Sequence, residues 1–189
     1  VDDKIKRAVE LQASQILQEG KLTLVNKEGD TVYTLDFKPK VTHFPTVTVP
    51  WSSIATADPL GDLEPLADVI RADGKIDPNM LFMGSIALKN FLANERVQKA
   101  MDNRNIDIGA IRPEMTDRGA TFYNYIWIGA YRFEIWTYPD TYKNAATGLP
   151  KSYIDPDNVI MMSDRTRLDM TSARVPLPLG PDPRVAGLL

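Results

Sequence analysis

The chain has 189 residues, of which 43% are hydrophobic and 25% charged, values typical of a folded globular protein with one domain or two small lobes sharing a core. Its formal net charge of -3 and lack of a clustered basic face argue against sequence-specific binding of nucleic acid. Cysteine is absent and histidine occurs once, which excludes disulfides, thiolate nucleophiles and cysteine-based zinc sites.

The ends of the sequence carry no targeting signal. We find no signal peptide and no apolar run of the roughly 20 residues that a membrane-spanning helix needs. The chain begins at Val1, without a methionine and already in a helical pattern, so we expect an N-terminal truncation. Residues 185–189 likewise suggest a cut C-terminus.

Residues 2–18 have the spacing of an amphipathic helix. Ile5, Val9 and Ile16 fall on one face, and Gly20 suits the position just after the last turn. The apolar stripe is narrow and the charges are many. This pattern predicts a helix that lies across a sheet with one face exposed to solvent.

The next segment reads as a hairpin followed by an extended arm. Strand-like runs between residues 22 and 37 flank the turn 26–30, which contains Asn, Gly and Asp. Residues 41–49 are rich in Val and Thr and are bounded by Pro50, which favours an edge or connecting position over a central strand.

A compact α/β block is predicted from Trp51 to the short helix that contains Met101. A helix over 63–71 would use Asp62 as its N-cap and end at Gly74. The apolar run 80–83 predicts a buried strand. Two helices should follow, one opening at Gly84-Ser85 and a shorter one capped by Asn94.

The clearest strand signal spans residues 120–138. Alternating residues on both sides of Gly129-Ala130 predict a hairpin with one buried face and one aromatic-rich face. A last short strand is expected over 159–162. Beyond residue 164 the chain becomes polar and then proline-rich, with prolines at 176, 178, 181 and 183.

Candidates for catalysis or metal binding are few, and each has a simpler structural explanation. His43 lies in the extended arm, and no strained nucleophile turn such as GxSxG accompanies it. The acidic sets, which lack EF-hand spacing, read as helix N-terminal charge and a turn. Phosphate-binding glycine motifs are absent, and a carboxylate pair for glycoside hydrolysis cannot be told from scattered acids. We therefore predict no catalytic, cofactor-binding or metal-binding residues and no enzyme activity. The acidic sets are Asp58, Asp62, Glu64 and Asp68, and Asp155 with Asp157.

The aromatic hairpin is the remaining candidate for ligand binding. Tyr123, Tyr125, Trp127 and Trp136 are side chains of the type that stack on sugars or on unpaired bases. The alternative interpretation is that these rings pack between sheet and helix, or between subunits. The packing interpretation is the simpler one.

In the order of its elements, the chain resembles the lambda-type major capsid protein (capsid protein E) family. The similarity extends over most of residues 1–165 and lies in local strings, not in a catalytic motif. These strings are Gly20-Lys21-Leu22-Thr23-Leu24, Ala57-Asp58-Pro59-Leu60 after Trp51, the strand from Met80 to Gly84, Ile135-Trp136-Thr137-Tyr138, and Tyr153-Ile154 before Val159-Ile160-Met161-Met162.

The resemblance implies an α+β fold, the tailed-phage major capsid fold. A long spine helix would lie on an elongated antiparallel sheet in a peripheral lobe, beside an α/β axial lobe. Residues 1–50 would be peripheral, 51–119 axial, and 120–165 would return to the peripheral lobe, leaving 166–189 as a proline-rich C-terminal segment. The family's N-terminal arm and extended loop would precede Val1, so the fragment alone should assemble poorly.

The resemblance also implies a function. The chain would be a head subunit of a tailed phage or prophage, joining copies of itself in hexamers and pentamers of an icosahedral shell around DNA. A scaffold or decoration protein would be a further partner, DNA contact would be non-specific and no membrane would be bound. Assembly would occur in the bacterial cytoplasm and the product would be the virion. A bacterial compartment shell is a close variant. The alternatives are a carbohydrate- or ligand-binding module using residues 121–138, and a hydrolase using His43.

Overall fold

The computed structural model describes residues 2–26, 29–102, 114–116, 119–144 and 147–166. The proline-rich segment predicted near the C-terminus lies outside these ranges. Four α-helices, one 3-10 turn and nine strands occur in the described part. They are α1 (Asp2–Glu19), β1 (Lys21–Val25), β2 (Thr31–Asp36), η1 (Val41–His43), α2 (Pro59–Gly74), β3 (Met80–Met83), α3 (Ser85–Ala93), α4 (Glu95–Asp102), β4 (Glu114–Met115), β5 (Thr121–Ile128), β6 (Tyr131–Thr137), β7 (Thr141–Lys143), β8 (Pro150–Ser152) and β9 (Val159–Met162).

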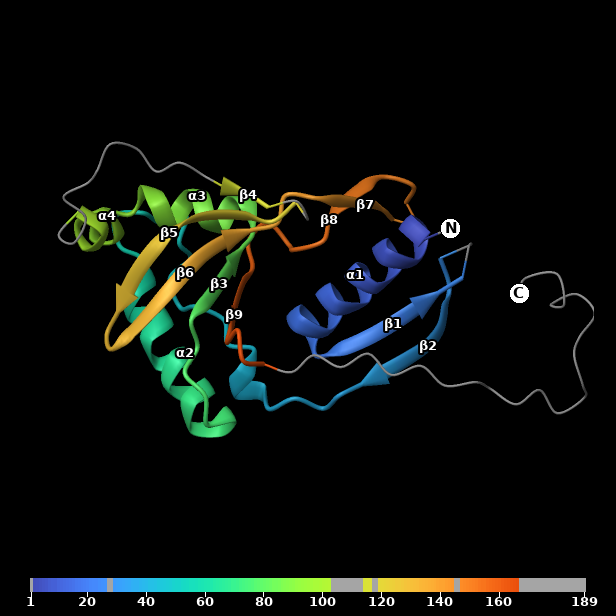
Figure 1. Cartoon of the computed structure of the whole chain (residues 1–189), viewed down its shortest axis with the longest axis horizontal. Helices are drawn as coiled ribbons and strands as arrows, with labels where there is room; N and C mark the ends of the chain where they lie inside the picture. Colours follow the sequence, from blue (N-terminus) through green and yellow to red (C-terminus); the bar gives the residue numbers. More distant parts are fainter. Residues whose placement is uncertain (1, 27–28, 103–113, 117–118, 145–146, 167–189) are drawn as a thin grey trace, which may run out of the picture.

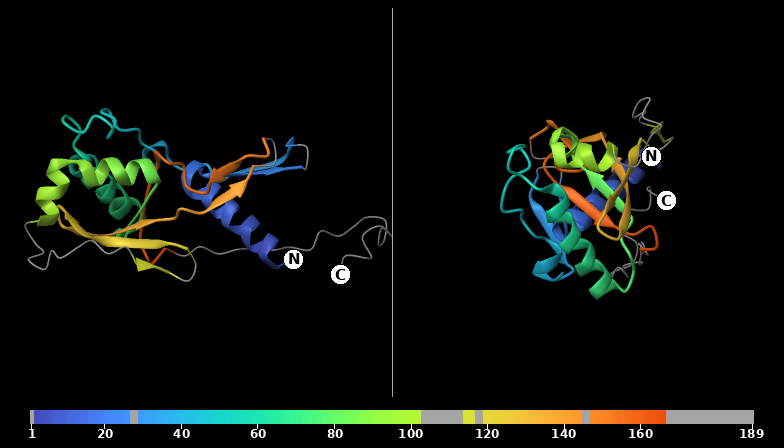
Figure 2. Two further views of the ribbon diagram at one scale, coloured as in Figure 1. Left: turned by 90° about the horizontal axis from the view of Figure 1, so that it is seen from above. Right: turned by 90° about the vertical axis from the view of Figure 1, so that its left-hand side faces the viewer.

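The molecule is elongated, with two groups of elements at its two ends (Figures 1 and 2). One end holds α2, α3, α4 and a five-stranded sheet of order β4-β5-β6-β3-β9. The other holds α1 between the β1–β2 hairpin and the short β7–β8 hairpin. The predicted helix at the N-terminus, the two long hairpins and the strand at 80–83 are all confirmed.

Helix α1 lies beside the β1–β2 hairpin instead of across it. The backbone N–H of Thr23 donates to Gln15 Oε1 at 3.2 Å. Because a strand's N–H groups lie in the plane of its sheet, this bond places α1 along the free edge of β1, as Figure 1 also shows. The prediction that the helix covers a sheet face was therefore wrong, and both faces of the hairpin keep exposed residues.

The core lies between the five-stranded sheet and the three helices α2, α3 and α4, which lie on one side of it (Figure 2). Strand β3 runs parallel to β6 and antiparallel to β9. Apolar residues that alternate along the strands point toward the helices, as the period of two requires. The fully buried side chains of this core include Leu81, Met83, Phe91, Val97, Ile126, Ile128, Phe133 and Ile135.

Strand pairing differs from the predicted arrangement. Residues 120–165 were expected to return to the sheet formed by residues 1–50, but β5, β6 and β9 form one sheet with β3 of the middle block. The pairing Leu81↔Ile135 brings two fully buried side chains together under the helices. Burial of that continuous apolar surface favours this arrangement over pairing with the exposed β2.

Two local predictions near the second helix also need correction. Helix α2 begins at Pro59, and its N-cap is Asp58, whose carboxylate accepts from the N–H of Gly61 at 3.3 Å. Asp62, the predicted cap, instead accepts from the Trp51 indole N–H at 2.9 Å.

The predicted extended arm contains the 3-10 turn η1. Asn94 does cap α4, since its side-chain oxygen accepts from the N–H of Arg96 at 3.0 Å.

A turn at residues 153–158 joins the two ends of the molecule. The side-chain amide of Gln18 in α1 donates to the Tyr153 carbonyl at 2.9 Å and accepts from the Asp155 N–H at 2.8 Å. The same turn meets the start of α3, where the N–H of Ala87 donates to the Pro156 carbonyl at 2.9 Å. A Cβ on Gly84 would lie 2.1 Å from the Asp155 carbonyl oxygen. The contact therefore requires glycine at position 84.

Candidate assembly surfaces

His43 is tied to an acid at the surface. Its Nε2 lies 2.8 Å from Asp73 Oδ2, and the Lys40 ammonium donates to the other carboxylate oxygen of Asp73 at 2.6 Å. The hydrogen bond from Lys40, followed by that from His43, lowers the pKa of the Asp73 carboxyl. These contacts fasten η1 to α2. Within the described part of the chain, no hydroxyl nucleophile is hydrogen-bonded to His43, so the arrangement lacks the third group that a catalytic triad needs.

The acidic residues near α2 point to separate partners. Asp58 caps the helix and pairs with Arg96. Asp68 accepts from the Tyr131 hydroxyl at 2.7 Å, and Asp62 accepts from Trp51. Each of these three carboxylates, Asp58, Asp62 and Asp68, therefore has a structural contact of its own. Among the residues that the structure describes, no three His, Cys, Asp or Glu side chains gather closely enough to hold a metal ion.

The second acidic pair forms a turn. Asp155 Oδ1 accepts from the N–H of Asp157 at 3.2 Å, and the N–H of Asn158 donates to the Asp155 carbonyl at 3.0 Å. Asparagine and aspartate stabilise turns through side-chain bonds of this kind. The pair thus supports the turn that connects α1 with α3.

The aromatic residues of the β5–β6 hairpin are divided between two faces by a bulge. The register of β5 shifts between Phe122 and Asn124, which leaves Tyr123 as the extra residue. Tyr123 packs against the helix-covered core. Tyr125 and Trp127 remain on the opposite face, with 39% and 45% of their surface exposed. The four rings predicted as one binding surface therefore do not share one.

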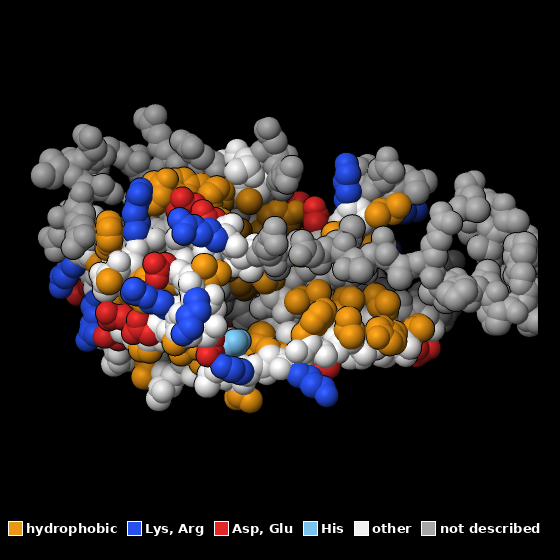
Figure 3. Space-filling model, turned by 60° about the horizontal axis from the view of Figure 1, so that its bottom comes forward, with side chains coloured by type: hydrophobic (Ala, Val, Ile, Leu, Met, Phe, Trp, Pro, Cys, Tyr) orange, Lys and Arg blue, Asp and Glu red, His pale blue; other side chains and the backbone are white. Residues whose placement is uncertain are grey.

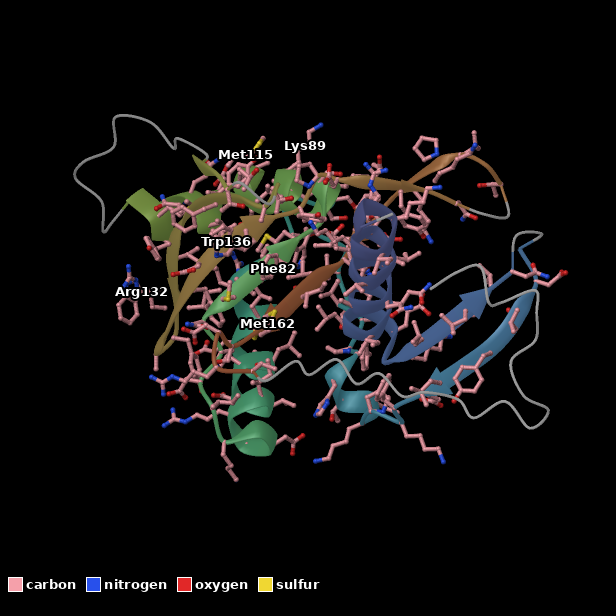
Figure 4. The ribbon with its side chains drawn as sticks, turned by 45° about the vertical axis from the view of Figure 1, so that its right-hand side comes forward. Phe82, Lys89, Met115, Arg132, Trp136 and Met162 are labelled. Atoms are coloured by element: carbon pink, nitrogen blue, oxygen red, sulfur yellow. The ribbon has the colours of Figure 1, made fainter. Side chains whose placement is uncertain are left out.

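An aromatic face covers the side of the five-stranded sheet opposite the helices. We define it as Phe82, Phe122, Tyr125, Trp127 and Trp136. The ring centroids of Phe122 and Trp136 lie 5.2 Å apart, those of Phe122 and Tyr125 lie 5.0 Å apart, and Phe82 stacks on Trp136 at 6.3 Å. Figure 4 shows Trp136 and Phe82 on neighbouring strands of this face.

Two features extend the aromatic face, strand β9 at one end and the Arg132 side chain at the other. Ile160 and Met162 pair in register with Phe82 and Met80, so they point to the same side as the aromatic rings. At the far end the Arg132 guanidinium lies 4.0 Å above the centre of the Tyr125 ring. Beside it is an open hollow of about 340 Å³, lined by Ala100, Met101, Asn124, Tyr125, Ile126, Trp127 and Arg132.

Sequence reasoning missed Phe82 and Phe122 as members of this face. Phe82 was assigned to a buried strand as part of a continuous apolar run. Only the pairing Phe82↔Trp136 shows that it faces away from the helices. No alternation of residue types within 80–83 indicated this, because all four residues are apolar. The alternation is one of burial in the structure, where Leu81 and Met83 are fully buried and Met80 and Phe82 are half-buried.

A second exposed apolar surface lies on the β1–β2 hairpin. The pairs Leu22↔Leu35 and Leu24↔Tyr33 place four apolar side chains on one face. Tyr33 is 54% exposed and the neighbouring bulge residue Val32 is 70% exposed. Figure 3 shows hydrophobic side chains gathered over this end of the molecule. We call Leu24, Val32, Tyr33, Leu35 and Phe37, all exposed, the hairpin patch.

The two exposed apolar surfaces are the main functional feature of the described chain. Exposed apolar patches on a folded domain are typical of surfaces that contact other proteins. The hairpin patch and the aromatic face lie at opposite ends of an elongated α+β chain, and no catalytic constellation is assembled in its described part. The described part of the chain therefore presents two apolar surfaces of the kind through which proteins associate.

The particular family follows from comparison with known proteins. Residues 1–177 match the family described as phage major capsid protein E. Because the match extends over more than half of the sequence, the chain belongs to this family, as the resemblance implied. The family is structural and its members are components of the phage capsid. A comparison with curated proteins finds no match.

A solved structure has a similar fold. It is that of a protein assigned as the capsid protein of prophage in E. coli CFT073, with a TM-score of 0.58 and 17% sequence identity. The similarity covers 85% of this chain but 45% of that chain, so the present sequence spans less than half the length of its structural relative. In the described ranges, no helix is long and apolar enough to cross a membrane.

Proposed function

We propose that this chain is part of a shell-forming subunit that assembles with copies of itself into the closed icosahedral head of a tailed phage or prophage. Membership of the capsid protein E family is the observation that carries the proposal. The exposed hairpin patch supports it, because a shell subunit needs contact surfaces that are apolar yet lie outside its own core. Each contact can be weak, since many neighbours act together.

The two ends of the molecule suggest how the lobes divide. We propose that α1 with the β1–β2 and β7–β8 hairpins forms the peripheral lobe, and that α2, α3, α4 and the five-stranded sheet form the axial lobe. The strand order supports this division and moves β5, β6 and β9 from the peripheral to the axial lobe. Hexamers and pentamers would then be centred on the axial lobe.

Other partners follow from the same proposal. A scaffold or decoration protein would bind the assembled shell, and packaged DNA would be contacted without sequence specificity, consistent with the net charge of -3. Assembly would take place in the bacterial cytoplasm, and the protein would act in the virion without enzymatic activity. The ligand-binding alternative is weaker, because Tyr123 packs toward the core and only Tyr125 and Trp127 of the four predicted rings line the hollow.

Negative-stain microscopy of the intact gene product tests the proposal. The gene should be expressed with the neighbouring scaffold gene where one is present. We expect closed particles of uniform diameter. A product that stays monomeric with the scaffold supplied, at concentrations where it is folded, would contradict a shell function.

A further inference from the structure

The β1–β2 hairpin is a two-stranded sheet with one open edge in the described part of the chain. Helix α1 lies along β1, whereas no described strand pairs with the outer edge of β2 (Figure 1). Every residue of β2 is exposed. A sheet of two strands is at best marginally stable in water, and three or more strands are needed for independent stability. The hairpin is therefore suited to gain a further strand beside β2.

The backbone groups of β2 that face the open edge follow from its pairing with β1. The N–H of Phe37 donates to the Gly20 carbonyl at 3.1 Å, so the backbone of Phe37 faces β1. Backbone groups of successive residues point to opposite sides of a strand. Tyr33 and Leu35 therefore also face β1, while the N–H and C=O groups of Thr34 and Asp36 face the open edge.

A bulge and a bend limit the open edge to residues 33–37. The register between β1 and β2 shifts at Val32, which has no partner in β1 and interrupts the regular alternation. At the other end Lys38 has a positive φ of 49°, and its N–H donates to Asp36 Oδ1 at 2.8 Å. A partner strand can thus pair regularly only with the segment between these two positions.

This segment is complementary to itself when two copies run antiparallel about Leu35. Thr34 of one copy then lies opposite Asp36 of the other, and each such pair can exchange both backbone hydrogen bonds. On one face Tyr33 lies opposite Phe37, and Leu35 lies opposite its own copy. Tyr33, Leu35 and Phe37 are 54%, 38% and 53% exposed, so the pairing covers apolar surface that the described part of one chain leaves in water.

The neighbouring two-fold registers are less suitable. One centred on Thr34 would require the bulge residue Val32 to pair with Asp36. One centred on Asp36 would require Lys38 to pair with Thr34, although the Lys38 N–H already has a partner. The register about Leu35 avoids both conflicts, and it places the one charged side chain of residues 33–37 opposite an uncharged threonine.

We propose that β2 of one chain pairs with β2 of a second copy across a two-fold axis at Leu35, so that the two hairpins form one continuous sheet. As a contact between shell subunits, this inference rests on the proposed function and covers part of the hairpin patch. A two-fold contact is complete with a single partner, so it joins subunits in pairs and leaves other surfaces for larger assembly.

Disulfide trapping in this chain tests the pairing, because its sequence contains no cysteine. In a non-hydrogen-bonded antiparallel pair the two Cα atoms lie about 4.5 Å apart, within the range that a disulfide spans. We expect Leu35→Cys to form a covalent dimer under mild oxidation. The matched control is Val32→Cys, whose two copies would lie about 20 Å apart in this register. It should cross-link several-fold more slowly, although Val32 is 70% exposed.

Proline provides a second test at the same edge. Adding Thr34→Pro to Leu35→Cys removes an outward N–H that the hairpin itself does not use, a position where an edge strand tolerates proline. This variant should lose the cross-link, whereas Thr34→Val, which keeps the N–H, should retain it. Substitutions that change only the side chain at position 34 should have little effect, because that side chain lies on the face opposite the apolar pairs.

Each result decides the proposal. Circular dichroism should first show that the variants are folded. Equal rates for Leu35→Cys and Val32→Cys, or no dimer of Leu35→Cys, would overturn the proposal. A faster rate for Thr34→Cys would also overturn it, because the pairing would then be centred on Thr34.

Failure of the shell function would be a different result. Particles from the intact gene product, with no preferential cross-link of Leu35→Cys in this chain, would reject the strand pairing but not the shell. Preferential cross-linking in this chain, with no particles from the intact gene product, would support the pairing and count against a shell.

Discussion

At the scale of single residues, Gly84 has a structural role that can be tested directly. Its backbone, with φ -64 and ψ 161, is open to any amino acid, so steric contact alone requires glycine. A Cβ would lie 2.1 Å from the Asp155 carbonyl oxygen and 2.5 Å from that of Pro156. We expect Gly84→Ala to lower the free energy of unfolding by about 1–3 kcal/mol, the usual cost of overpacking.

Urea unfolding measures this effect, with Gly74→Ala as the matched control. Gly74 ends α2, and a Cβ there would meet Ile76 at an ordinary 3.4 Å. The control should be neutral or slightly stabilising, because alanine favours helix over glycine by up to about 1 kcal/mol. Equal stability of the two variants would show that the 153–158 turn does not press on Gly84 as described.

Tyr138 makes the stability of the folded chain depend on pH in the alkaline range. Burial, followed by the charge of Glu10, raises its pKa to about 12. The unfolded chain would ionise near pH 10, so the folded state keeps the proton more tightly. Its stabilising contribution is complete below pH 10 and disappears as the pH rises through about 12.

Unfolding of the wild type and of Tyr138→Phe, followed between pH 9 and 12, tests this assignment. Phenylalanine cannot ionise, so the variant should lose less stability with rising pH than the wild type does. A parallel loss in both proteins would show that Tyr138 is not the responsible group. Tyr153, whose pKa burial also raises, remains in both proteins and accounts for part of the slope.

Residue roles were only partly predictable from sequence. The cap at Asn94 was predictable because capping depends on neighbours in the chain. The roles of Gly84 and Asp62 were not, because they depend on the turn at Asp155 and on the indole of Trp51, which approach through the fold.

At the scale of elements, the attachment of α1 depends on a few polar contacts. Gln18 bonds to the Tyr153 carbonyl, to the Asp155 N–H and to the Asn158 side chain. Removing this half-buried amide takes a partner from the Asp155 N–H and from the Asn158 side chain, whereas the Tyr153 carbonyl still accepts from the Ser14 hydroxyl. We expect Gln18→Ala to destabilise the protein by about 0.5–1.5 kcal/mol, the net contribution of a typical hydrogen bond.

Thermal unfolding compares this variant with Gln98→Ala. Gln98 is exposed and makes one bond, to the Leu92 carbonyl, so its loss should change stability by no more than about 0.5 kcal/mol. Hydrogen exchange adds a local measurement, in which α1 should lose protection in Gln18→Ala while β3 keeps it. Unchanged protection of α1 would contradict the attachment described.

The existence of most elements was predictable, but their pairing was not. Periodicity indicated the helix at 2–18 and the hairpin at 120–138, since it reflects local burial. It carries no information on which strand lies next to which, so the union of β6 with β3 was missed. The bulge that turns Tyr123 toward the core likewise breaks the alternation on which the predicted aromatic surface depended.

At the scale of the whole molecule, this member of the phage major capsid protein E family is elongated and carries apolar surface outside its core. The family match assigns the chain to the phage major capsid protein E family, and the fold is similar to that of a solved structure. The order of the elements in the sequence resembled the same family, but contact surfaces had no sequence signature of their own. Only the exposure of Val32 and Tyr33 identified the hairpin patch.

Sedimentation velocity of the intact gene product, with any scaffold supplied, tests the shell function most directly. The wild type should sediment as large particles of narrow size distribution. Val32→Glu with Tyr33→Glu, which charges the hairpin patch, should remain folded and sediment mainly as small species, whereas Thr34→Glu on the other face of β2 should still form particles. A wild type that stays a monomer under all these conditions would contradict the shell function. A charged hairpin patch that leaves the particle yield unchanged would contradict assembly through this surface.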